Sequence, residues 1–123
     1  MSIDTVERLL EWVEACDNMA AVFQKDMDWD AELDARDDDT FDRRWVEENR
    51  KVSSGTGCES ELLKLNVLRE AVFKKVYRIT SNPELAGCAS DDFGLIGEKI
   101  MKHVESDWVD WLLGSYLSGH FPS

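Results

Sequence analysis

Residues 60–80 read SELLKLNVLREAVFKKVYRIT and form the most apolar helical pattern of the chain. Apolar side chains recur there at steps of three and four residues, which places them on one face of an α-helix. The row consists of Leu62, Leu65, Leu68, Val72, Val76 and Ile79. Ser60 is a favourable N-cap residue, so we predict a helix that starts there and lies at the centre of the core.

The same spacing extends over most of the remaining chain. Before the central stretch, we predict one helix over residues 4–24 and another from Thr40 to about residue 52, followed by a Ser/Gly loop over 53–60. After it, Pro83, Ser90 and Asp107 indicate further helix starts. No segment alternates apolar and polar residues over the length of a strand. The sequence therefore predicts an all-α fold, with residues 1–123 forming a single compact domain of five or six helices.

The chain is strongly acidic. Its 123 residues include 26 Asp and Glu against 14 Lys and Arg, which gives a formal net charge of -12 at pH 7. A molecule of this charge repels the phosphates of nucleic acids and the headgroups of anionic membranes. Hydrophobic residues still make up 43% of the chain, which is enough for a folded core. We therefore expect no direct binding to nucleic acid and none to membranes.

The termini and the cysteines indicate a reducing compartment. The first residues lack the basic and apolar regions of a secretory signal peptide, and no apolar run approaches the roughly 18 residues of a membrane span. Cys16, Cys58 and Cys88 are widely spaced and include no CxxC pair, so neither a zinc knuckle nor a redox dithiol is indicated. We expect a cytoplasmic protein.

The most unusual feature is an acidic segment over residues 26–42, between two predicted helices. It holds nine acidic residues, and Arg36 is its only base. Like charges so close together repel, which favours a solvated loop over a continuous helix. Trp29 lies inside this run, however, and a large aromatic ring has no use in a loop that only increases solubility. A recognition surface for a basic protein is therefore a second interpretation, beside the solvated loop.

The recognition interpretation gives a role to each part of the segment. The surface potential would steer a basic protein onto the carboxylates, while Trp29 and Trp45 would fill apolar pockets of that partner. The predicted partner-binding residues are Asp26, Asp28, Trp29, Asp30, Glu32, Asp34, Asp37, Asp38, Asp39, Asp42 and Trp45.

Part of the same segment resembles an EF-hand calcium loop. Acidic residues occupy the loop positions 1, 3, 5, 7, 9 and 12, namely Asp26, Asp28, Asp30, Glu32, Asp34 and Asp37. The resemblance covers only these twelve residues. It departs from the motif at Ala31, where the loop needs glycine, and at Asp37, where it needs glutamate. A calcium-binding or metal-dependent helical protein is an alternative.

Signs of catalysis are weak. His103 and His120 have no neighbours at metal-ligand spacing, and no phosphate-binding glycine loop or nucleophile elbow is present. The pairs Glu11 with Glu14 and Asp107 with Asp110 have the spacing that MazG-type pyrophosphohydrolases use for Mg²⁺, but not that family's order of pairs. We therefore expect no enzymatic activity and no cofactor.

A basic stretch follows on the central predicted helix. It contains Lys64, Arg69, Lys74, Lys75 and Arg78. These residues either neutralise the acidic first half within the chain or form a second contact site, such as a head-to-tail homodimer. The sequence leaves both interpretations open.

In general character the chain resembles bacterial toxin-neutralising immunity proteins, which are small, acidic and helical and lack catalytic motifs. This resemblance implies a non-catalytic protein that neutralises or masks a basic partner, such as a toxin, nuclease or other effector, by occluding its surface. The closest alternative is a phage-type anti-defence protein whose carboxylates mimic the charge of DNA. It would need regular charge spacing and would block several unrelated DNA-binding proteins.

Overall fold

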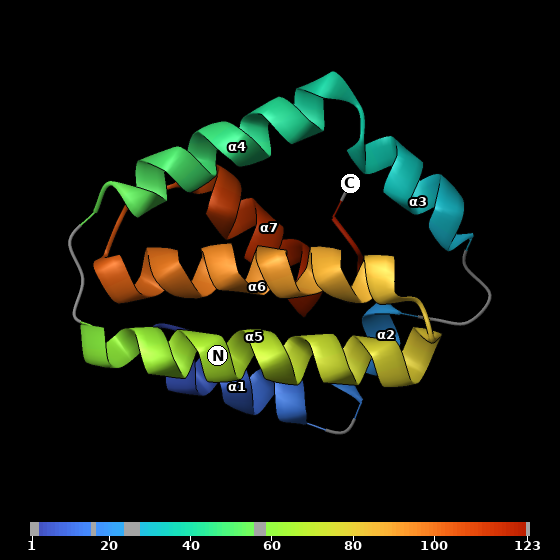
Figure 1. Ribbon diagram of the computed structural model, residues 1–123, viewed down its shortest axis with the longest axis horizontal. Coiled ribbons are helices and arrows are strands. Elements are labelled where there is room, and N and C mark those ends of the chain that lie inside the picture. The colour runs from blue at the N-terminus through green and yellow to red at the C-terminus, as the bar shows by residue number, and fades with distance from the viewer. Residues whose placement is uncertain (1–2, 16, 24–27, 56–58, 123) are drawn as a thin grey trace.

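All regular structure among the described residues is helical (Figure 1). The computed structural model describes residues 3–15, 17–23, 28–55 and 59–122. Within these ranges the helices are α1 (Val6–Glu14), α2 (Asn18–Val22), α3 (Trp29–Arg36), α4 (Asp39–Ser53), α5 (Glu59–Thr80), α6 (Pro83–Lys102) and α7 (Asp107–Leu117). The predicted all-α class is confirmed, but seven helices are described rather than five or six. None of them is long and apolar enough to cross a membrane.

The antiparallel pair α5 and α6 forms the centre of the structure (Figure 1). Leu65, Leu68, Val72 and Val76 of the predicted apolar row are buried, whereas Leu62 is exposed. At Gly97 of α6 an added Cβ would lie 2.7 Å from Leu65 Cδ1, so a larger residue there would force the buried Leu65 side chain to shift. The spacing of apolar residues therefore identified the central helix correctly.

The other helices cover this pair from two sides. α1 packs mainly against α5, and α7 packs against α6. α3 and α4 arch over the side of α6 that faces away from α5, and the C-terminus lies close to α3 (Figure 1). Acidic residues 28–42 therefore lie at one edge of the molecule and α5 lies at the other.

The predicted helix over residues 4–24 is wrong in one respect, because the chain forms two helices there. Ala15 leaves the helical conformation with φ -62° and ψ 138°, and α2 starts three residues later. The Asn18 side-chain amide donates to the Trp12 carbonyl oxygen at 2.9 Å, which satisfies a backbone acceptor at the end of α1. A side chain thus ends the helix where apolar spacing alone indicates continuation.

Two boundaries elsewhere also differ from the prediction. No helix starts at Ser90, because this residue lies inside α6, whose 20 residues extend from Pro83 to Lys102. The Ser90 hydroxyl donates to the Arg69 carbonyl oxygen, and Asp92 is fully buried. The predicted loop over 53–60 is shorter, since Ser53 still belongs to α4 and Glu59 already belongs to α5. Residues 56–58 of that loop lie outside the described ranges.

The acidic inter-helix segment is not a continuous loop. It contains α3 and the first turn of α4, while residues 26 and 27 lie outside the described ranges. Asp28 caps α3 by accepting from the Ala31 amide at 3.2 Å, and Asp38 caps α4 by accepting from the Thr40 amide at 2.8 Å. Aspartates at helix starts stabilise helices, so the same residues that disfavour one long helix allow two shorter ones.

We predict that Gly97→Ala destabilises the protein by about 1 kcal/mol or more, since crowding against Leu65 and Leu68 outweighs the better helix propensity of alanine. The matched control is Gly87→Ala in the same helix, where an added Cβ meets nothing within 4 Å. This control should stabilise the protein slightly. Urea denaturation of both variants tests the pair, and equal shifts would contradict the close approach of α5 and α6.

Candidate functional site

α3 attaches to the rest of the molecule through one face. Trp29, Leu33 and Arg36 are spaced by four and three residues and point inward. The Trp29 ring packs at 5.4 Å from Phe23 and lies edge-on at 6.0 Å from Phe121, measured between centroids. Trp29 is therefore half-buried against the core, and only part of its ring is open to a partner.

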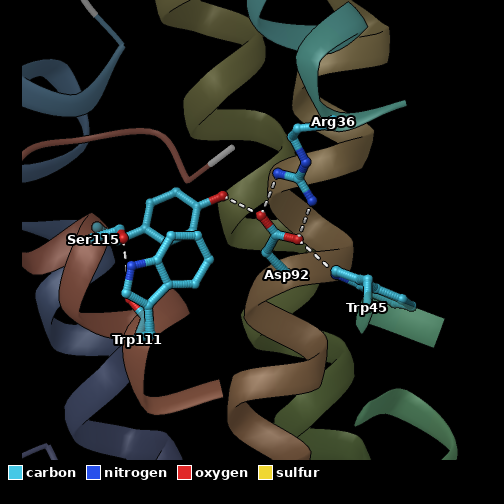
Figure 2. Close-up of polar contacts among 6 residues, drawn as sticks. Arg36, Trp45, Asp92, Trp111 and Ser115 are labelled. Carbon is cyan, nitrogen blue, oxygen red and sulfur yellow. Dashed lines mark hydrogen bonds and ion pairs between the residues drawn. The ribbon is translucent and has the colours of Figure 1, made fainter. Parts of the chain in front are cut away.

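Arg36 forms a buried ion pair with Asp92 of α6 (Figure 2). Its Nη1 donates to Oδ2 and its Nη2 to Oδ1, both at 2.7 Å, which is the paired geometry of a strong arginine–carboxylate contact. The Arg36 side chain is 9% exposed and that of Asp92 is fully buried. The only base of the acidic segment is thus used to hold α3 on α6.

Two further helices donate to the same carboxylate. Trp45 Nε1 of α4 donates to Asp92 Oδ1 at 2.9 Å, and the Tyr116 hydroxyl of α7 donates to Oδ2 at 2.6 Å. Asp92 therefore accepts four hydrogen bonds from three helices. No buried side-chain nitrogen or oxygen among the described residues lacks a partner. This full satisfaction offsets the cost of removing the charges from water.

Aromatic rings enclose the arginine. The Arg36 guanidinium carbon lies 4.6 Å from the centroid of Phe41 and 4.9 Å from that of Phe121. Such contacts stabilise a cation that has lost its water. Phe121 thus contacts both Trp29 and Arg36, so the C-terminal end of the chain helps to fix α3.

The ionisation of this cluster is set by burial and by Asp92. Burial lowers the pKa of Arg36, but the hydrogen bonds and the charge of Asp92 outweigh it and raise the pKa above its ordinary value. Burial, together with the negative charge of Asp92, raises the pKa of Tyr116 well above its ordinary value. Arg36 is therefore always charged, and Tyr116 stays a neutral hydrogen-bond donor in the folded protein.

The outer sides of α3 and of the start of α4 carry the remaining predicted residues. We call this the acidic surface. Its exposed members are Asp28, Asp30, Asp34, Asp37, Asp38, Asp39 and Asp42, and Glu32 is half-exposed. Within the described parts of the chain, no Lys or Arg forms an ion pair with any of these seven aspartates. Asp26 lies outside the described residues.

A hollow of about 650 Å³ adjoins the acidic surface between α4 and α7. Its lining includes the rings of Phe41 and Trp108 and the charged side chains of Asp38, Arg43 and Glu47. The second predicted tryptophan, Trp45, is half-buried and its indole N–H is bonded to Asp92. Apolar area beside the acidic surface is thus offered mainly by this hollow.

The calcium-loop alternative does not fit the conformation of the chain. An EF-hand loop wraps around its ion so that its ligands converge. Residues 29–36 instead form a helix, which points Glu32 away from the side that carries Asp30 and Asp34. Among the residues that the structure describes, no group of three or more His, Cys, Asp or Glu side chains could hold a metal ion.

The sequence reasoning missed the cluster around Asp92. Two signals were present in the sequence. Arg36 is the single base among nine acids, and Asp92 precedes the apolar residues Phe93, Leu95 and Ile96. A single base on an acidic helix and an acid at the start of an apolar run are candidates for a long-range pair, although 56 residues separate them.

We predict that Asp92→Asn destabilises the protein by about 3–5 kcal/mol, because it leaves the buried Arg36 cation without its counter-charge. The adjacent Asp91→Asn is the control. Asp91 pairs with Arg69 at 2.7 Å but is 55% exposed, so its loss should cost less than about 1 kcal/mol. Urea denaturation followed by circular dichroism measures both, and similar values for the two variants would contradict a special role of the buried pair.

We also predict that Tyr116 does not ionise while the protein is folded. In a Tyr77→Phe background it is the only tyrosine. No tyrosinate absorbance should develop at about pH 10, where ordinary tyrosine is half ionised. Because only the unfolded chain then releases this proton, stability should fall as the pH rises above about 10. The additional replacement Tyr116→Phe should remove this part of the pH dependence, and tyrosinate formation in the folded protein would contradict the prediction.

Comparison with known proteins identifies one related family. A family model with the description "Immunity protein PIM1" matches residues 8–123. No curated protein matches the chain.

Proposed function

The chain belongs to the PIM1 family of immunity proteins, and we propose that it neutralises a basic protein partner by covering that partner with the acidic surface. The family implies binding to a partner such as a toxin, in a non-catalytic role. The basic character of the partner and the occlusion mechanism are our proposal, and the following observations support them.

The observation that carries the proposal is that no Lys or Arg among the described residues forms an ion pair with the seven exposed aspartates of the acidic surface. Seven exposed aspartates lie within fifteen residues, and Arg36, the only base of residues 26–42, is buried against Asp92. Mutual repulsion of these carboxylates lowers the stability of the free protein. A partner with Lys and Arg side chains would relieve the repulsion, so binding recovers free energy that folding gives up.

The way in which α3 is held also supports recognition of a partner. Trp29, Leu33 and Arg36 attach the inner face of the helix to the core, so the carboxylates on its outer sides are presented on an ordered helix. A preorganised surface loses less conformational entropy on binding than a mobile loop does. This arrangement favours the recognition interpretation over the purely solvated loop.

The mechanism would combine electrostatic steering with contacts at the hollow. The negative potential accelerates encounter with a basic surface, most strongly at low ionic strength. After docking, an apolar or cationic side chain of the partner enters the hollow against Phe41 and Trp108, while the open edges of Trp29 and Trp45 add contact area. Groups of the partner that hold nucleic acid or substrate are then covered.

The test starts with capture of the partner from lysate of the native host. The tagged protein is loaded at low salt, and bound proteins are released by stepping to about 0.5 M salt, where the Debye length is about 4–5 Å. The proposal predicts one basic protein, retained specifically. Several unrelated DNA-binding proteins released together would instead indicate mimicry of DNA charge.

We predict that Asp30→Asn, Asp34→Asn and Asp37→Asn together lower the rate of association with that protein by about tenfold at low salt and flatten its salt dependence. These three side chains are exposed and form no capping hydrogen bond, so their charge is changed without loss of a helix cap. Stopped-flow mixing at several salt concentrations measures the rates.

The matched control removes three charges elsewhere. The control variant carries Glu11→Gln, Glu14→Gln and Asp17→Asn. The three positions belong to α1 or follow it directly, on the other side of the molecule from α3 (Figure 1). These residues are exposed as well. The control should change the rate by much less than the α3 variant. Equal effects of the two triple variants would show that only net charge matters, and would remove the acidic surface from the mechanism.

A further inference from the structure

A second exposed surface lies on α5, across α6 from α3 and α4 (Figure 1). It holds five of the eight exposed large hydrophobic side chains of the described residues, each 38–71% exposed. They are Leu62, Leu63, Val67, Phe73 and Tyr77, and the last two rings stack at 6.3 Å between centroids. Several large apolar side chains exposed on one helix of so charged a protein mark an interaction surface.

The outer side of α5 has the spacing of a coiled-coil seam. Leu63, Val67, Glu70, Lys74 and Tyr77 follow one another at steps of four, three, four and three residues. All five are exposed. The row lies opposite the buried row of the same helix, so α5 has one face in the core and a second face suited to another helix.

The charged residues of this seam are complementary to the same residues of a second, antiparallel copy. Glu70 and Lys74 form an ion pair at 2.9 Å within the helix, and both are more than 60% exposed. In an antiparallel pairing about a two-fold axis level with residue 72, residues equally far from the axis lie opposite each other. Glu70 of each copy then faces Lys74 of the other, and Val67 faces Tyr77.

We propose that α5 is the interface of a symmetric homodimer. Two other bases of this helix are matched within the chain, since Lys64 pairs with Glu7 and Arg69 pairs with Asp91. A chain with a net charge of -12 repels a second copy over most of its surface. The α5 face combines apolar side chains with balanced charges, so it is where a second copy fits.

A groove beside the seam also fits the antiparallel pairing centred on residue 72. A shallow groove of about 440 Å³ runs beside it and is lined by Asn66, Arg69, Glu70, Phe73, Lys74 and Ser90. The pairing places Tyr77 of the second copy next to this groove, and the two Phe73 rings meet close to the axis. The acidic surfaces lie away from this interface, so each dimer presents two of them, whatever they bind.

A charge swap tests the interface. Sedimentation equilibrium should show a dimer for the unchanged protein. Glu70→Lys alone or Lys74→Glu alone replaces two ion pairs per dimer by repulsion, so each should weaken dimerisation about tenfold. Both substitutions together restore opposite charges across the axis and should return the dissociation constant to near its original value. Val67→Glu should abolish the dimer.

Circular dichroism of each variant checks that α5 remains folded. The Asp30→Asn, Asp34→Asn, Asp37→Asn variant is the control for the interface and should dimerise like the unchanged protein, since it alters only the acidic surface. A monomer at all concentrations would overturn the proposal. So would a double variant no better than the single ones, which would show that the seam does not meet a copy of itself in this register.

Discussion

The buried pair of Arg36 and Asp92 is the interaction on which the rest of the arrangement depends. One carboxylate on α6 receives donors from α3, α4 and α7, so it joins three elements that are distant in the sequence. A single unmatched donor or charge here would lower the free energy of unfolding by several kcal/mol, whereas the complete set of contacts changes it little. The cluster thus selects one position for α3 more than it adds stability.

This fixed position explains how a strongly acidic helix can exist on the surface. α3 has few apolar residues, and its aspartates repel one another. Its attachment relies on Arg36, on the rings of Phe121 and Phe41 around it, and on Trp29 and Leu33. The free energy that holds α3 comes from its inner face, which leaves its carboxylates available for a partner.

The sequence predicted those features that depend on local spacing. The buried row of α5 was found because steps of three and four residues need no knowledge of the rest of the chain. The end of α1 was missed because it depends on the Asn18 side chain reaching back to the Trp12 carbonyl. The start predicted at Ser90 was wrong because its polar run is satisfied by contacts with other helices. The acidic segment was recognised, but its attachment through Arg36 requires a partner 56 residues away.

Amide hydrogen exchange, on the free chain and on its complex with the protein that it captures, tests the central claim most directly. If the acidic surface binds the captured protein, amide exchange in peptides covering residues 28–42 should be slower in the complex than in the free chain. Peptides from the outer face of α5, residues 62–78, should not change if the oligomeric state is the same in both samples. Slower exchange elsewhere, with residues 28–42 unchanged, would contradict the claim that the acidic surface binds the partner.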